Sequence, residues 1–204
     1  ALTAWLCAPG VVAESLELLM QGAAAQAELA ACVRCDPVLA LRLRLHPVDF
    51  GTQQDLLRAL LLAAPVASGA AQVAHAARWR QSVGVAHLAQ TLAVRAGVAD
   101  AEAAWTAGLA HNLADYLDTG PTPPAHAADW LADAVRYHAE PLVRGRAAHP
   151  LVRIVQLAYQ LVTRADAVDS VDVRAALAAL QLGAGEAAQL LGDSQAQARR
   201  LAQR

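Results

Sequence analysis

The chain has 204 residues, of which 56% are hydrophobic and 17% charged, and a formal net charge of −2. This length and apolar content suffice to bury a substantial core and exclude a disordered chain, while the lack of a basic excess argues against a general nucleic-acid binder. No apolar run reaches the about 20 residues that span a bilayer, so we expect a soluble chain with no membrane partner. Three cysteines are an odd number for a disulfide framework, so we expect the reducing environment of the cytoplasm.

The composition predicts an all-α fold, because Ala, Leu, Val and Arg dominate, so that strong helix formers outnumber the few strand-favouring aromatic residues. In the N-terminal part, the first helix is indicated by an apolar stripe at helical spacing, made by Val12, Leu16, Leu19 and Met20. Residues 27–35 predict a second helix, and Asp36 is expected to cap a third that begins at Pro37. These helices form a predicted smaller lobe of about residues 1–68.

A second lobe, about residues 70–204, is predicted as a larger bundle of helices. After a passage rich in Gly and Ala, a helix from Val85 to Ala96 is expected to end at Gly97, and Asp100 to begin the next helix, which runs on through Leu113 and Leu117. Three prolines predict a loop at 119–124, and a helix through Trp130, Val135 and His138 follows it.

The clearest amphipathic pattern lies between residues 151 and 162. Its apolar stripe consists of Leu151, Ile154, Val155, Ala158, Leu161 and Val162, and Arg153, Gln156 and Gln160 are expected on the opposite face. The tail from 169 to 204 is predicted to hold two or three short helices, broken at Gly183, Gly185 and Gly192.

Cys32 and Cys35 form a CxxC motif on a predicted helix. Such a pair binds metal or cycles between thiol and disulfide in some proteins, but here there is no second pair and no βαβ context. The other interpretation is that both are small apolar residues that pack on one helical face.

Three histidines lie where an apolar pattern is interrupted or a helix ends: His111, followed by Asn112, then His138 and His149. Histidines brought together by helix packing can bind a metal, but a hydrolytic metal site also needs carboxylate oxygens. A single histidine in such a place is more often a hydrogen-bonded structural residue.

Arg78, Trp79 and Arg80 suggest either a stacking platform for a nucleobase or a tryptophan that anchors the core. A nucleotide-binding or nucleic-acid-binding switch built on them is a third functional hypothesis, which the absence of a basic excess disfavours.

Taken in order, these segments resemble the HD-related output domain (HDOD) family of bacterial signalling proteins. The resemblance rests on short motifs at similar spacing: residues 28–30 with 36–39, Trp79 with Ser82, residues 107–109 with His111, residues 134–138, and residues 149–152 with 157–158. It implies an HD-like multi-helix bundle with a smaller N-terminal lobe.

Related catalytic HD phosphohydrolases hold divalent metal with a His, a His-Asp pair and a later Asp. The resemblance places Gln81, His111, Asn112 and Tyr159 at these four positions, so that only His111 keeps the ligand type. It therefore implies a vestigial site with no metal and no cofactor, and a chain that is not an enzyme. The expected function is a regulatory or scaffolding domain that binds other signalling proteins, with dimerisation left open.

The alternative is a residual metal-dependent phosphohydrolase with a rearranged site. Its ligands would come from His111, Asp115, His138 and Glu140, and Asp115 follows His111 by one helical turn, a spacing that puts both side chains on one face.

Overall fold

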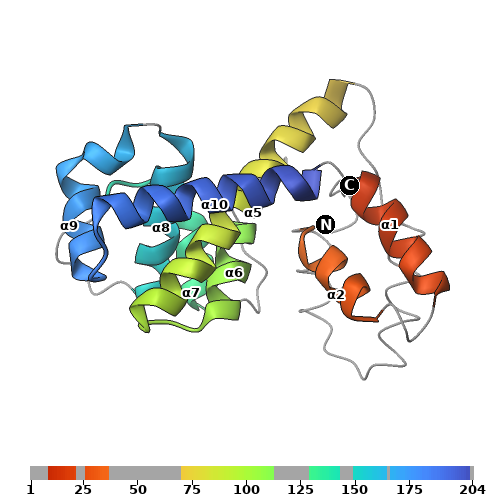
Figure 1. Cartoon of the computed structure of the whole chain (residues 1–204), viewed down its shortest axis with the longest axis horizontal. Coiled ribbons are helices and arrows are strands. Elements are labelled where there is room, and N and C mark those ends of the chain that lie inside the picture. The colour runs from red at the N-terminus through yellow and green to blue at the C-terminus, as the bar shows by residue number, and fades with distance from the viewer. Residues whose placement is uncertain are drawn as a thin grey trace. The chain divides into compact units, whose positions relative to one another are not determined.

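The computed structural model describes residues 9–21, 26–36, 70–112, 129–142, 149–164 and 166–202. In these ranges it contains eight α-helices, one short 3-10 helix and no strand, so the all-α prediction is confirmed (Figure 1). The chain divides into two compact units, residues 1–79 with Arg204 and residues 80–203. The predicted division into lobes at about residue 69 stays a prediction.

The described helices of the first unit begin with α1 (Pro9–Met20) and α2 (Gln26–Arg34), which pack against each other. The predicted apolar stripe of α1 is partly wrong, because Met20 is 86% exposed whereas Ser15 is fully buried. The Ser15 hydroxyl donates to the Cys32 thiol at 3.4 Å, so the face toward α2 runs through Val11, Val12 and Ser15. Asp36 is buried, but the helix expected from Pro37 lies outside the described residues.

Trp79 anchors the core of the first unit. Its side chain is only 5% exposed, and its indole N–H donates to the carbonyl oxygen of Cys35 at 2.9 Å. A buried indole that has found a hydrogen-bond acceptor is a packing residue. The core-anchor interpretation is confirmed, and the stacking platform is wrong because no base can reach a buried ring.

Helix α5 (Ala70–Ala96) is 27 residues long and continues from the first unit into the second. It starts earlier than predicted, since the Ala-rich passage before Val85 is itself helical and Ala is the strongest helix former. The predicted buried series is confirmed at Val85, Leu88 and Leu92. Gly97 ends the helix as expected, with a φ of +62° and its N–H donating to Ala93.

Three further helices of the second unit pack on one another: α6 (Ala101–Ala110), α7 (Asp129–Tyr137) and α8 (Pro150–Thr163). Asp100 caps α6 as predicted, because its carboxylate accepts from the Ala103 N–H at 2.6 Å. The predicted continuation through Leu113 and Leu117 and the loop at 119–124 lie outside the described residues.

The C-terminal region contains a 3-10 helix, η4 (Ala167–Asp169), followed by α9 (Val171–Ala179) and α10 (Ala184–Ala202). Gly183 separates α9 from α10 as predicted, but α10 runs through Gly185 and Gly192, so those two breaks are wrong. Packing offsets the low helix propensity of glycine here, since side chains of α10 are buried at the helical repeat of Ala187, Leu190, Ser194 and Ala198.

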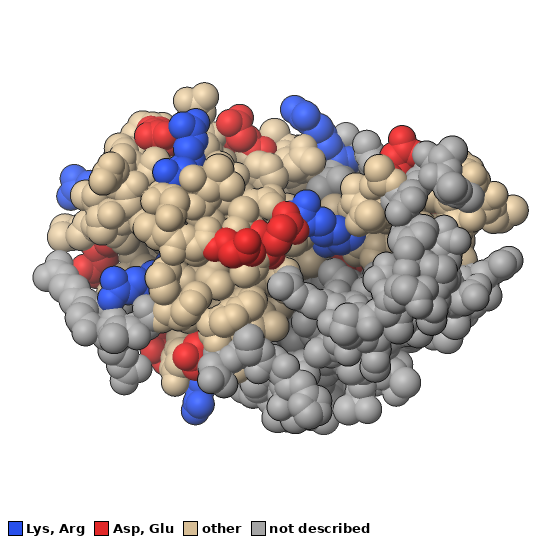
Figure 2. Space-filling view, turned by 90° about the horizontal axis from the view of Figure 1, so that it is seen from below, with Lys and Arg blue, Asp and Glu red and all other residues tan. Residues whose placement is uncertain are grey.

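No helix in the described ranges has both the length and the apolar character needed to cross a membrane. On the face seen in Figure 2, the described arginines occur in several separate places and are interspersed with acidic and uncharged side chains.

Candidate functional site: a buried histidine–tyrosine cluster

His111 is the C-cap residue of α6, directly after Ala110, and not a mid-helix residue as the sequence suggested. Its side chain is fully buried, and Asn112 beside it is 5% exposed. The Nδ1–H of His111 donates to the carbonyl oxygen of Gly108 at 2.6 Å, which fixes the tautomer and leaves Nε2 as an acceptor. Nε2 is buried and has no hydrogen-bond partner within the described part of the chain.

The aromatic rings of three residues meet at this point. We call this set the ring cluster; it consists of His111, His138 and Tyr159. The ring centroids lie 5.0 Å apart for His111 and His138, 5.3 Å for His111 and Tyr159, and 4.8 Å for His138 and Tyr159. All three pairs meet edge to face. This is the preferred packing of aromatic rings, so the cluster is a packed arrangement that joins the ends of α6 and α7 to α8.

Burial dominates the electrostatics of the ring cluster. It lowers the pKa of His111 from 6.5 to about 3, since the imidazolium would lose its hydration. The hydrogen bond to Gly108 opposes this shift in pKa, and repulsion from His138 adds to it. His111 is therefore neutral at physiological pH. His138 lies just past α7, and its Nδ1–H donates to the carbonyl oxygen of Val135 at 2.7 Å.

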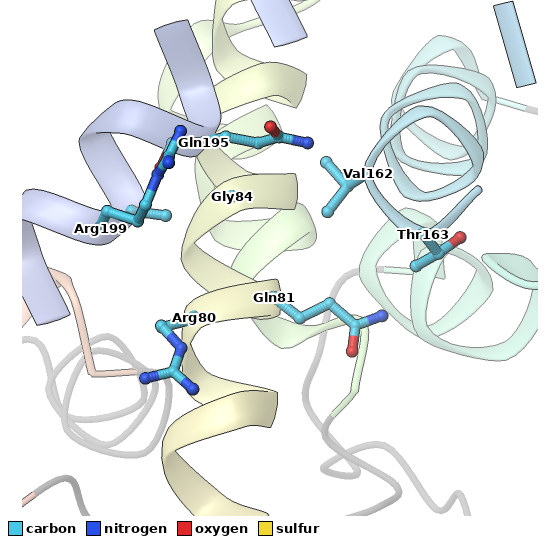
Figure 3. Close-up of a pocket in the computed structure, with 8 residues that line it drawn as sticks. Arg80, Gln81, Gly84, Val162, Thr163, Gln195 and Arg199 are labelled. Carbon is cyan, nitrogen blue, oxygen red and sulfur yellow. The ribbon is translucent and has the colours of Figure 1, made fainter. Parts of the chain in front are cut away.

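The other predicted site residues are only partly brought together. Gln81 lines a separate pocket between α5, α8 and α10, where its neighbours on α8 are Val162 and Thr163, about one helical turn beyond Tyr159 (Figure 3). Glu140 is exposed, and Asp115 lies outside the described residues. The structure thus places three of the predicted vestigial-site residues, His111, Asn112 and Tyr159, near His138. The sequence had included His138 only in the ligand set of the alternative, residual phosphohydrolase.

Gln156 is a polar residue near the ring cluster that the sequence pattern misplaced. It was expected on the exposed face of α8, but it is 4% exposed, and its Nε2 donates to the carbonyl oxygen of Tyr137 at 2.8 Å. This bond satisfies a carbonyl at the end of α7, one residue before His138. A polar residue flanked by apolar Val155 and Leu157 was the only signal in the sequence.

We expect Gln156→Met, which keeps the side-chain length, to lower the free energy of unfolding by about 1 kcal/mol through loss of this hydrogen bond. Urea unfolding followed by circular dichroism measures the change. Gln160→Met, at a partly exposed position of the same helix, is the control and should leave stability nearly unchanged. Equal effects of the two substitutions would contradict the assigned bond.

His149 has a structural role in the described structure. It is the N-cap of α8, where its Nδ1 accepts from the Leu151 N–H at 3.3 Å, and its ring stacks on Trp130 with centroids 6.4 Å apart. Pro150 follows at the first helical position, where its missing N–H costs nothing. The structural interpretation of this histidine is confirmed.

The thiols of Cys32 and Cys35 make hydrogen bonds within the first unit. Cys32 donates to the carbonyl oxygen of Val11 at 3.7 Å, and the buried Cys35 donates to Ala31 at 3.2 Å. These contacts agree with the packing interpretation of the CxxC motif.

The resemblance to HD phosphohydrolases would imply a divalent metal, and the described residues do not fit one. The ring cluster offers two imidazoles and a phenol, and Asn112 supplies an amide at the position where the resemblance places the carboxylate of catalytic HD phosphohydrolases. Within the described ranges, no group of three or more His, Cys, Asp or Glu side chains is placed to hold a metal ion. Neutral donors neither balance the charge of a dication nor favour hard divalent ions in the way carboxylates do.

Comparison with known proteins gives one match. The family model of the HDOD domain matches residues 54–125, a stretch that includes α5, α6, Gln81, His111 and Asn112 but ends before His138 and Tyr159. Searches among curated proteins and among solved structures gave no match. The match confirms the resemblance seen in the sequence: residues 54–125 carry the signature of an HDOD domain, an HD-related signalling domain.

Proposed function

We propose that this chain is a non-catalytic regulatory or scaffolding domain that acts in the bacterial cytoplasm by binding other signalling proteins. The observation that carries the proposal is the ring cluster. His111, at the retained ligand position, is fully buried and in edge contact with the rings of His138 and Tyr159. The HDOD match supplies the signalling context.

The chemistry of the donors supports the loss of hydrolytic activity. Metal-assisted hydrolysis needs a cation that lowers the pKa of a bound water and an open coordination position for that water. The amides of Gln81 and Asn112 carry no charge, and Tyr159 fills the space beside His111 with a ring. Retaining the helical framework while replacing these ligands preserves a surface for partners without the reaction.

One observation favours the residual phosphohydrolase as a second candidate. The Nε2 atom of His111 is an unpartnered acceptor within the described part of the chain, held in the tautomer typical of metal-binding histidines. The decisive experiment therefore has to distinguish an Nε2 atom that packing leaves without a hydrogen bond from an Nε2 atom that binds a metal ion.

The experiment compares the wild-type chain with Asn112→Asp, which restores the carboxylate beside His111. Both are purified without a histidine tag, and their melting temperatures are measured with and without Mn²⁺. Wild-type melting should not respond to Mn²⁺. In Asn112→Asp the new carboxylate is buried, so we expect a loss of about 2 kcal/mol of stability at neutral pH that Mn²⁺ does not restore.

Hydrolysis of bis(p-nitrophenyl) phosphate in the presence of Mn²⁺ is the parallel assay. The proposal predicts no difference between wild type and His111→Ala in this assay. Near-stoichiometric bound metal together with turnover that disappears in His111→Ala would overturn it and establish the phosphohydrolase.

A further inference from the structure

The two cysteines of the CxxC motif lie in the turn that ends α2, where the backbone holds them close together. The N–H of Cys35 donates to the carbonyl oxygen of Cys32 at 3.0 Å. The next N–H, that of Asp36, donates to Val33 at 3.1 Å. Both bonds span three residues, so α2 ends in a 3-10 turn, in which side chains three positions apart are eclipsed. Cα atoms at this spacing lie about 5–6 Å apart, within the about 4.4–6.8 Å that a disulfide bridges.

The two thiols differ in their access to solvent. Cys32 is half-buried, whereas Cys35 is buried with 7% of its surface exposed. The Cys32 thiol also accepts from the hydroxyl of the buried Ser15 at 3.4 Å, so one side of it faces α1. An accessible thiol next to a buried one is the arrangement in which the first reacts with an oxidant and the second resolves the product.

A disulfide between these cysteines requires a change in the backbone. Cβ atoms three positions apart on a helix lie about 5–6 Å apart, whereas those of a disulfide lie about 3.5–4.5 Å apart. Closing the bond therefore deforms the end of α2 and moves the Cys35 carbonyl. That carbonyl accepts from the indole N–H of Trp79 at 2.9 Å, so the change reaches the buried anchor of the first unit.

We propose that Cys32 and Cys35 are a redox modification site, which forms a reversible disulfide by exchange with a small disulfide such as oxidised glutathione. The Cys32 thiolate attacks one glutathione sulfur and releases the first reduced glutathione. The Cys35 thiolate then attacks Cys32 Sγ and releases the second. Two cysteine thiols are oxidised, one glutathione disulfide is reduced, and the two thiol protons end on the two released glutathiones. This regulation does not depend on the proposed binding of signalling proteins.

Trypsin gives a direct test, because Arg34 lies between the two cysteines and is the first cleavage site of the chain. Cleavage places Cys32 in peptide 1–34 and Cys35 in peptide 35–42. The native chain is incubated with oxidised glutathione at pH 8, where more of an ordinary thiol is ionised, then blocked with iodoacetamide, denatured and digested. Mass spectrometry should find the two peptides joined, lighter by two hydrogen atoms than their sum. Excess reduced glutathione, added before blocking, should separate them.

Cys7→Ser is the matched control, since Cys7 also lies in peptide 1–34, and it should leave the linkage unchanged. Cys35→Ser should stop at a mixed disulfide of Cys32 with glutathione, whereas Cys32→Ser should leave peptide 35–42 without glutathione because Cys35 is buried. Absence of joined peptides in the wild type, loss of the linkage in Cys7→Ser, or a linkage that reduced glutathione does not reverse would overturn the proposal.

Tryptophan fluorescence measures the effect on Trp79. The emission of the wild type should change on oxidation and return on reduction, because the indole loses its bond to the Cys35 carbonyl. Trp79→Phe keeps an aromatic ring at this position and leaves the other three of the four tryptophans in place, so its emission should not respond. An equal response in Trp79→Phe would disprove the coupling of the disulfide to this anchor.

Discussion

Replacing Gly108 by alanine should destabilise the chain by about 2–3 kcal/mol or more, within the range of overpacked cores. A Cβ atom at this position would lie 2.6 Å from Ala86 Cα, 2.9 Å from Ala86 N and 3.0 Å from the carbonyl oxygen of Val85. These are backbone atoms of α5, so no side chain can turn away to relieve the clash. The helices α5 and α6 would have to separate, and Gly108 also supplies the carbonyl that orients His111.

The size of this effect is measured by urea unfolding, with Gly84→Ala as the control. Gly84 is an interior residue of α5, and the methyl group added there would make only ordinary van der Waals contacts. Alanine is the better helix former by about 1 kcal/mol, so Gly84→Ala should raise stability by up to that amount. If Gly108→Ala were as stable as Gly84→Ala, the close approach of α5 and α6 would be disproved.

Local signals in the sequence were sufficient to predict many of the helices and several of their ends. Asp100 and Gly97 act through hydrogen bonds to residues three or four positions away, so their roles as caps can be predicted without knowing the fold. The same local rules placed wrong breaks at Gly185 and Gly192, because packing along α10 outweighs the propensity of single glycines.

Which face of a helix is buried could be predicted less well. In α1 the buried face includes Ser15, whose partner Cys32 lies on another helix, and it leaves out Met20. In α8 the amide of Gln156 is buried because the end of α7 provides a carbonyl for it. Both errors have one cause: a polar side chain joins the core when a neighbouring element offers a partner, and spacing along one helix does not contain that information.

For the candidate site, the family resemblance predicted that His111 and Tyr159 occupy related positions, and their rings are in contact. Spacing within single helices could not show that the end of α7 brings His138 to the same point, or that Gln81 faces a pocket with α10. These outcomes depend on how the helices pack. The ring cluster and the pocket that Gln81 lines therefore could not be predicted from the spacing of residues within single helices.

The second large effect we expect is a loss of stability in acid caused by His111. Its pKa is lowered to about 3 in the folded chain and is about 6.5 when unfolded, so the unfolded state binds the proton first as the pH falls. Stability from this group is fully present above pH 6.5 and falls by about 1.4 kcal/mol for each pH unit below that value. The loss is about 2 kcal/mol at pH 5 and about 4 kcal/mol near pH 3.

His111→Phe isolates this contribution from the other titrating groups. Phenylalanine keeps an aromatic ring against His138 and Tyr159, and it removes the buried Nε2 while giving up the bond to Gly108. At pH 7 the stability gained by removing the buried, unpaired Nε2 and the stability lost with the hydrogen bond to Gly108 should nearly cancel, since each is worth about 1 kcal/mol. Urea unfolding at pH 7 and pH 5 should then show the variant losing about 2 kcal/mol less than the wild type. Parallel losses would contradict this prediction, because they would mean that His111 takes up its proton equally in the folded and unfolded states.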